Sequence, residues 1–122
     1  MNRIVHFELA AEKPERAAGF YQKIFGWKFQ KWSGQMEYWM VETGDKSEPG
    51  INGGFMKKDP KMPPTAHTID VKSLDETVKH IEKNGGKVVM PKMAIPGIGW
   101  FARFKDTEGN EVGLMQADKN AK

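Results

Sequence analysis

The chain contains no cysteine, and this absence removes several classes of function at once. Without thiols there can be no disulfide framework, no cysteine nucleophile and no cysteine-ligated zinc or iron–sulfur centre. A metal site would have to use carboxylates and the 3 histidines that the chain contains. We therefore expect a protein of a reducing compartment.

Long apolar runs and concentrated positive charge are also missing. No run approaches the roughly 18 to 20 apolar residues of a membrane span, and the first residues, MNRIV, begin a strand pattern rather than a signal peptide. We expect a cytoplasmic protein that does not bind membranes. The net charge is +3, but 19 Lys and Arg are interleaved with 16 Asp and Glu. The lack of a basic stripe argues against nucleic acid as a partner.

The first half of the chain reads as a strand, a helix and three more strands. From Ile4 to Leu9, apolar residues alternate with His6 and Glu8, which is typical of a strand with one face on a core. A helix follows, begun by Pro14 and ended at Gly26. Further strands are predicted at 27–32, 38–43 and 51–57, with a turn at 33–35. The apolar stripe predicted for the helix is Ala17, Phe20, Tyr21 and Ile24.

The second half repeats this order after a proline-rich linker, residues 58–64. Ser73 and Glu76 have the spacing of a capping box, which predicts the start of a second helix. Its buried stripe is expected to be Leu74, Val78 and Ile81. The alternation at 68–71 predicts the first strand of this half, and further strands are predicted at 87–90, 100–105 and 111–116, with a loop at 94–99 and a frayed tail at 117–122.

The two halves match each other in detail. Tyr21 and Gly26 correspond to Ile81 and Gly86, and the string at 54–56 (GFM) corresponds to 113–115 (GLM). We therefore predict an α+β fold of two tandem β-α-β-β-β modules, residues 2–57 and 65–116, in a single domain of residues 1–122. Their half-sheets are expected to pair around a concave interior that can hold a small molecule, with the helices outside.

Several segments carry a resemblance to a known family. They are His6, then Phe20-Tyr21 and Phe25-Gly26, the segments at 49–56 (PGINGGFM) and 91–100 (PKMAIPGIGW), and Glu108-Gly109-Asn110. With the doubled plan, they resemble the vicinal oxygen chelate superfamily of glyoxalases, extradiol dioxygenases, fosfomycin-resistance enzymes and bleomycin-binding proteins. The resemblance is greatest to small, single-domain glyoxalase-like proteins and implies a cupped sheet of two half-barrels.

The resemblance implies four positions for ligands of a divalent metal, on the first and last strands of each half. Of these, His6 can coordinate. The other three positions fall on Gly54, Ala66 and Gly113, none of which has a donor atom in its side chain. We therefore expect no cofactor and no standard metal site.

In an alternative interpretation, a metal is bound by a different set of ligands. A shift of one residue in the strand register would turn His67 into the interior, where Glu8 or Glu111 could join His6. The same shift would also bring Ile69 into the cavity.

Two residues are candidates for catalysis, His6 and Glu8, because an imidazole beside a carboxylate on a concave face can act as acid or base. The alternative for His6 is a structural hydrogen bond under the sheet. For Glu8 and Asp70, the alternative is a salt bridge to Arg103 or to a lysine.

Other side chains are predicted to bind the ligand. Methionines and aromatic residues can line an adaptable apolar pocket, although ordinary core packing would use them equally well. The predicted ligand-binding residues are Tyr38, Met40, Asn52, Met56, Thr68, Asp70, Trp100 and Met115.

Two functions remain open at this point. The first is a metal-free binding protein for a small molecule. The second is a lyase, isomerase or dioxygenase acting on a small carbonyl or oxygenated metabolite through His6 and Glu8. In either case we expect a homodimer, because half-sheets leave edges to protect and because the resemblance implies pairing.

Overall fold

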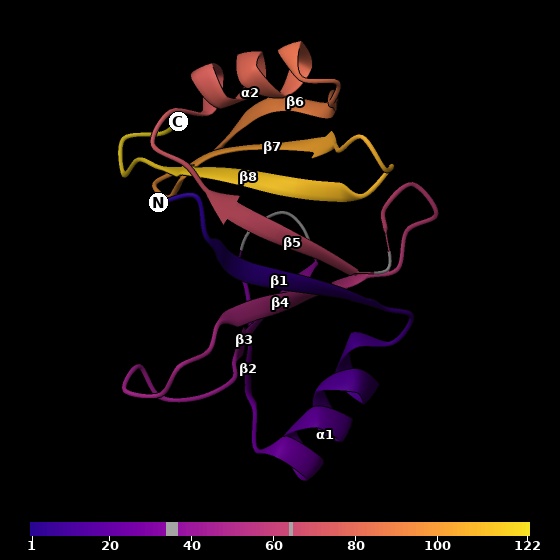
Figure 1. The fold of residues 1–122 in the computed structure, drawn as a ribbon. Coiled ribbons are helices and arrows are strands. Elements are labelled where there is room, and N and C mark those ends of the chain that lie inside the picture. Colours follow the sequence, from indigo (N-terminus) through magenta and orange to yellow (C-terminus); the bar gives the residue numbers. More distant parts are fainter. Residues whose placement is uncertain (34–36, 64) are drawn as a thin grey trace. The chain divides into compact units, whose positions relative to one another are not determined.

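The computed structural model describes residues 1–33, 37–63 and 65–122, and its elements follow the doubled order predicted from the sequence (Figure 1). The predicted α+β class is confirmed. Gly34 and Gln35 of the predicted turn, and Pro64 of the predicted linker, lie outside the described residues. The first copy comprises β1 (Ile4–Ala11), α1 (Pro14–Phe25), β2 (Lys28–Lys31), β3 (Tyr38–Glu42) and β4 (Asn52–Lys57). The second comprises β5 (Thr65–Asp70), α2 (Leu74–Lys83), β6 (Lys87–Ile95), β7 (Gly99–Lys105) and β8 (Glu111–Ala117).

The chain forms two compact units, residues 6–66 and residues 67–122 together with 1–5. In the first unit the strands run in the order β2-β3-β4-β1, with β1 parallel to β4. Phe55 is buried on the face that meets α1, where its ring lies edge-on to Tyr21 and Phe29 at centroid distances of 5.4 and 5.3 Å. Trp27 stacks on Tyr21 at 4.9 Å. The core of this unit is therefore largely aromatic.

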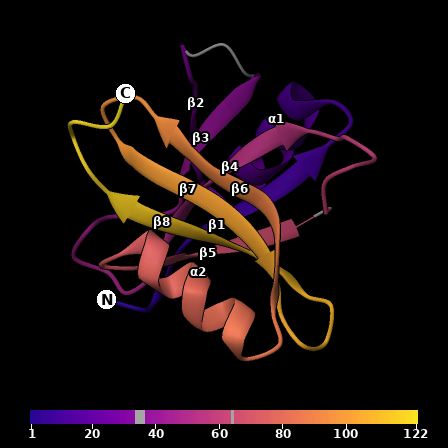
Figure 2. The same cartoon turned by 90° about the horizontal axis from the view of Figure 1, so that it is seen from above.

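The second unit repeats the arrangement, with strand order β5-β8-β7-β6 and β5 parallel to β8. Helix α2 lies across one face of this sheet (Figure 2). Leu74 is fully buried there against Leu114 and Ala102, and Val78 and Ile81 pack on the same cluster. The predicted stripe of α2 is confirmed, because these positions recur at helical spacing.

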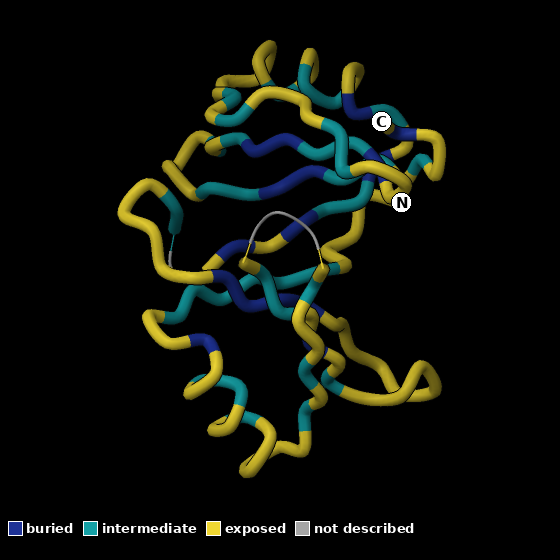
Figure 3. The backbone as a smooth tube through the Cα atoms, turned by 180° about the vertical axis from the view of Figure 1, so that it is seen from behind, coloured by how far each residue is buried: buried dark blue, intermediate teal, exposed yellow. Residues whose placement is uncertain are grey.

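Helix α1 is less buried than predicted, as the yellow and teal of its tube indicate (Figure 3). Phe20 and Ile24 are each 56% exposed, so the predicted stripe is wrong at these two positions. The buried or half-buried positions are Pro14, Ala17, Ala18 and Tyr21, spaced i, i+3, i+4 and i+7. The helix is rolled about its axis so that this stripe meets the sheet instead.

The end of β6 and the C-terminal tail also differ from the prediction. Strand β6 continues through Pro91 to Ile95, beyond the predicted end at residue 90. Proline is tolerated there because β6 is the last strand of its sheet and its pairing with β7 shifts register on both sides of Met90. The C-terminal tail is ordered rather than frayed, since Ala121 is buried and its carbonyl accepts a 2.9 Å hydrogen bond from the Gly97 N–H.

Candidate functional site

The face of the first sheet opposite α1 carries every site residue predicted for this half. Phe55 marks the α1 face, and neighbouring residues on a strand point to opposite faces. The pairing of β1, β4 and β3 then places one set of side chains together on the other face. This set is His6, Glu8, Tyr38, Met40, Asn52 and Met56.

A short hydrogen bond between His6 and Tyr38 is the central feature of this face. His6 Nε2 lies 2.7 Å from the Tyr38 hydroxyl oxygen, and the two rings are 15° from parallel. Burial lowers the pKa of His6, while the Glu8 carboxylate acts in the opposite direction and raises it. A neutral imidazole protonated at Nδ1 accepts the phenol O–H at Nε2 and keeps its own N–H as a donor.

Gly54 makes the placement of Tyr38 possible. A Cβ atom at Gly54 would overlap the hydroxyl and ring atoms of Tyr38. The phenol therefore covers the position that the family resemblance assigns to a metal ligand on the last strand. A larger residue at this position would displace the ring and, with it, the hydrogen bond to His6.

The second unit has the same arrangement without the hydroxyl. A Cβ atom at Gly113 would lie 2.9 Å from two ring atoms of Phe101. Phe101 is the partner of Met115 in the sheet, as Tyr38 is the partner of Met56. Both repeats thus place an aromatic ring over the glycine of the last strand.

Three predicted residues of the second half lie on the face that carries Gly113, namely Thr68, Asp70 and Met115. Thr68 is buried. The Asp70 carboxylate accepts a 3.2 Å hydrogen bond from the Arg3 N–H, and its backbone also bonds to that of Arg3. Asp70 therefore binds the N-terminal residues to β5 through these hydrogen bonds.

Two other predicted residues have structural contacts of their own. Asn52 Oδ1 accepts a 2.9 Å hydrogen bond from the Thr43 N–H. Trp100 follows the alternation of Ala102, so it lies on the α2 face, where it packs against the core. Its Nε1–H donates to Asp118 Oδ2 at 3.0 Å, and Lys92 Nζ lies 4.6 Å from the ring centroid. The prediction that Trp100 lines the same site as Thr68 does not fit this position.

The alternative metal ligands do not assemble into a site. His67 is exposed and shares the face of Ile69, which packs toward α2. Glu111 Oε2 lies 4.0 Å from Nη1 of the buried Arg103. Across residues 1–33, 37–63 and 65–122, no three His, Asp or Glu side chains are grouped as metal ligands. With glycines at 54 and 113 covered by rings, the residues present do not fit the divalent metal that the resemblance implies.

Sequence reasoning missed the His6–Tyr38 bond and the role of Phe101. The matching strings at 54–56 and 113–115 do identify the two glycines. However, which aromatic residue lies over each glycine depends on the register of β3 and β7, and short strands do not fix their register in sequence.

Comparisons with known proteins agree with this fold. Residues 3–44 match the family model described as bleomycin resistance protein-like N-terminal. A glyoxylase-like domain-containing protein of Didymella fabae is 34% identical over 115 residues, which is 88% of each chain.

Solved structures with low sequence identity share the fold. Methylmalonyl-CoA epimerase from Mycobacterium tuberculosis has a TM-score of 0.73 and 12% identity, over 94% of this chain and 87% of that chain. A hypothetical protein from Bacillus halodurans C-125 has a TM-score of 0.75 and 13% identity, over 98% of this chain and 97% of that chain.

None of the helices within the described residues is both long enough and apolar enough to span a membrane.

Proposed function

The chain belongs to the vicinal oxygen chelate superfamily, among its glyoxalase-like proteins, and from this premise we propose that it binds a small molecule on the sheet face around His6 and Tyr38. Binding takes place without the divalent metal that is usual in the superfamily. The function is that of a binding protein whose polar contacts come from side chains alone.

One observation carries this proposal. Gly54 has no donor atom, and the space above it is taken by the Tyr38 ring, whose hydroxyl lies 2.7 Å from His6 Nε2. His6 therefore has a phenol as its neighbour where a metal-binding relative would have a second ligand. A neutral imidazole that is hydrogen-bonded to a phenol suits recognition of ligand hydroxyl or carbonyl groups.

The apolar side chains around the pair support a ligand with an apolar body. Met40 is about half exposed and Met56 is buried on the same face. Methionine is flexible and polarizable, so such a surface adapts to ligands of irregular shape. Small-molecule sites commonly combine apolar walls with a few placed polar groups.

A thermal-shift screen of small aromatic compounds and carbonyl metabolites tests the binding function. We expect at least one compound to raise the melting temperature of the wild-type chain, and the shift to be reduced in Tyr38→Phe and in His6→Asn. His67→Asn is the matched control, because His67 is exposed and lies on the other face of its strand. A shift that survives both site substitutions, or that is lost equally in the control, would place binding elsewhere.

A second candidate function is proton transfer on a small carbonyl compound, as in a lyase or an isomerase. It is favoured by the lowered pKa of His6, which leaves the imidazole able to accept a proton, and by the nearby Glu8 carboxylate. Several structural neighbours are methylmalonyl-CoA epimerases, and one of these was solved with methylmalonyl-CoA. Carbon acids of this type are therefore reasonable first substrates.

Deuterium exchange separates the two functions. Methylmalonyl-CoA incubated with the protein in heavy water would lose its α-hydrogen signal in NMR if His6 removes that proton. Exchange that is abolished by His6→Asn and retained by His67→Asn would establish the enzyme. Ligand binding with no exchange for any carbonyl compound tested would support the binding function and contradict proton transfer.

A further inference from the structure

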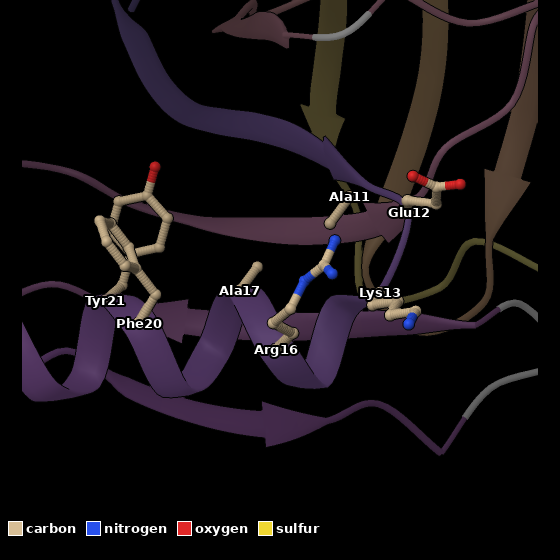
Figure 4. Close-up of a pocket in the computed structure, with 7 residues that line it drawn as sticks. All are labelled: Ala11, Glu12, Lys13, Arg16, Ala17, Phe20 and Tyr21. Carbon is tan, nitrogen blue, oxygen red and sulfur yellow. The ribbon is translucent and has the colours of Figure 1, made fainter.

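A hollow separate from the His6 face lies between the end of β1 and the first turns of α1 (Figure 4). Its volume is about 360 Å³, which falls within the roughly 300–1,000 Å³ of small-molecule sites. It is lined from one side by Ala11 and from the other by the α1 residues Arg16, Ala17, Phe20 and Tyr21. The two alanines leave the space that larger side chains would fill.

One end of the hollow is aromatic. The Phe20 ring is 56% exposed and meets the Tyr21 ring edge-on at 5.2 Å. Tyr21 is itself held between Trp27, stacked at 4.9 Å, and the buried Phe55, edge-on at 5.4 Å. Because Trp27 and Phe55 hold the Tyr21 ring, this ring is in place before a ligand arrives, and an aromatic ligand can pack against it at little cost in side-chain entropy.

The other end carries an excess of positive charge. Lys13 and Arg16 line this end together with a single carboxylate, Glu12. In Figure 4 the Arg16 side chain rises from α1 into the space below Ala11 rather than away from it. A guanidinium group in such a position can bind a carboxylate with two parallel hydrogen bonds.

We propose that this hollow is a binding site for a small aromatic carboxylate. The aromatic body packs against Phe20 and Tyr21, and the carboxylate pairs with Arg16, with Lys13 adding a second positive charge. Complementary charge at one end and aromatic packing at the other define the ligand class, and the site is independent of the one around His6.

Two-dimensional NMR with naphthalene-2-carboxylate as the probe tests this assignment. We expect the probe to shift the amide signals of residues 11–21 at concentrations that leave the β3 signals unchanged. Arg16→Gln should weaken binding by about tenfold or more, since charge-assisted hydrogen bonds are lost. The neutral analogue naphthalene-2-methanol should bind the wild type more weakly by a similar factor.

The controls use the same helix. Lys23→Gln removes a positive charge from the last turn of α1, outside the hollow, and should leave the affinity unchanged. Ala17→Leu fills the hollow and should abolish binding without removing any charge. The site assignment is overturned if the probe shifts only residues near His6, if Arg16→Gln and Lys23→Gln have equal effects, or if the alcohol binds as tightly as the carboxylate. The first of these outcomes would place the probe at the face around His6, and the other two leave ligand binding there untested and unchanged.

Discussion

At the scale of single residues, Gly54 and Tyr38 form a pair that neither residue would suggest alone. The glycine removes a metal ligand and also makes room for the phenol, which then reaches His6. Phe101 and Gly113 repeat the packing in the second unit without a hydroxyl. The hydrogen-bonded His6–Tyr38 pair therefore belongs to the first repeat, and the second repeat has only the packing of a ring on a glycine.

The Gly54–Tyr38 pair predicts a coupled mutational effect. Gly54→Ala should destabilise the protein by about 1–3 kcal/mol, because the added methyl group forces the Tyr38 ring from its place. In a Tyr38→Ala background the same change should cost much less. Gly44→Ala is the control, since an added Cβ there meets nothing within 4 Å. Urea denaturation measures the free energy of unfolding of the wild type, the two single variants, the double variant and the Gly44→Ala control. Equal costs of Gly54→Ala in the two backgrounds would contradict the packing.

The burial of His6 should make the free energy of unfolding depend on pH. Burial lowers its pKa below the ordinary 6.5, so in the window between the folded pKa and 6.5 the unfolded chain binds the proton more readily. Acid therefore favours unfolding, and the free energy of unfolding should fall as pH drops through 6.5 toward the folded pKa. His6→Asn should flatten this part of the curve of stability against pH. Curves of identical shape for wild type and variant would show that His6 titrates alike in both states.

At the scale of elements, the two helices are attached to their sheets to different degrees. Leu74 of α2 is fully buried in a cluster with Val71 and Leu114, whereas Ile24 of α1 is 56% exposed. Helix α1 meets the first sheet through the buried Pro14 and through Tyr21, whose ring contacts Trp27 and Phe55. The hollow beside α1 is a consequence of this lighter packing.

This difference predicts unequal costs for two similar substitutions. Leu74→Ala should lower the free energy of unfolding by about 2–5 kcal/mol, because it opens a cavity in a closed core. Ile24→Ala removes a similar volume from a side chain that is largely in water, so its cost should stay below about 1 kcal/mol. Denaturant titration of both variants gives the comparison. Similar losses would mean that Ile24 is covered in solution.

The sequence predicted most elements because their signals are local. Alternation gave the strands, Pro14 and Gly26 bounded α1, and the Ser73 cap, whose Oγ accepts from the Glu76 N–H at 3.2 Å, marked the start of α2. The roll of α1 was not predictable, since helical spacing fits more than one choice of buried stripe. The extension of β6 past Pro91 was missed because it depends on β6 lying at the end of its sheet, which is a non-local fact.

At the scale of the whole molecule, the repeat explains what could be predicted of the candidate site. Each repeat brings its first and last strands together as parallel neighbours, so the residues predicted on these two strands share one face. Alternation correctly grouped His6 with Glu8 and Thr68 with Asp70. It could not show that Trp100 lies on the α2 face or that Tyr38 bonds to His6, because both depend on pairing between strands that the sequence leaves unaligned.

We predict that the protein is a homodimer in solution. Among the described residues, β2 and β6 are the two end strands of the strand order, each with one strand neighbour, and Phe25 on α1 is largely exposed. Edge strands and exposed apolar side chains are commonly buried when two subunits associate. Light scattering at micromolar concentration should give twice the mass of 13.8 kDa. A clean monomer mass would contradict the prediction.

The metal content of the purified protein shows whether the site around His6 and Tyr38 works without a metal. The chain should be expressed in metal-supplemented medium, purified without chelator and analysed by elemental mass spectrometry beside His6→Ala. The site around His6 and Tyr38 is proposed to work without a metal, so both proteins should contain far less than one divalent ion per chain. A stoichiometric ion in the wild type that is lost in His6→Ala would show that His6 binds a metal and would contradict the proposed metal-free site.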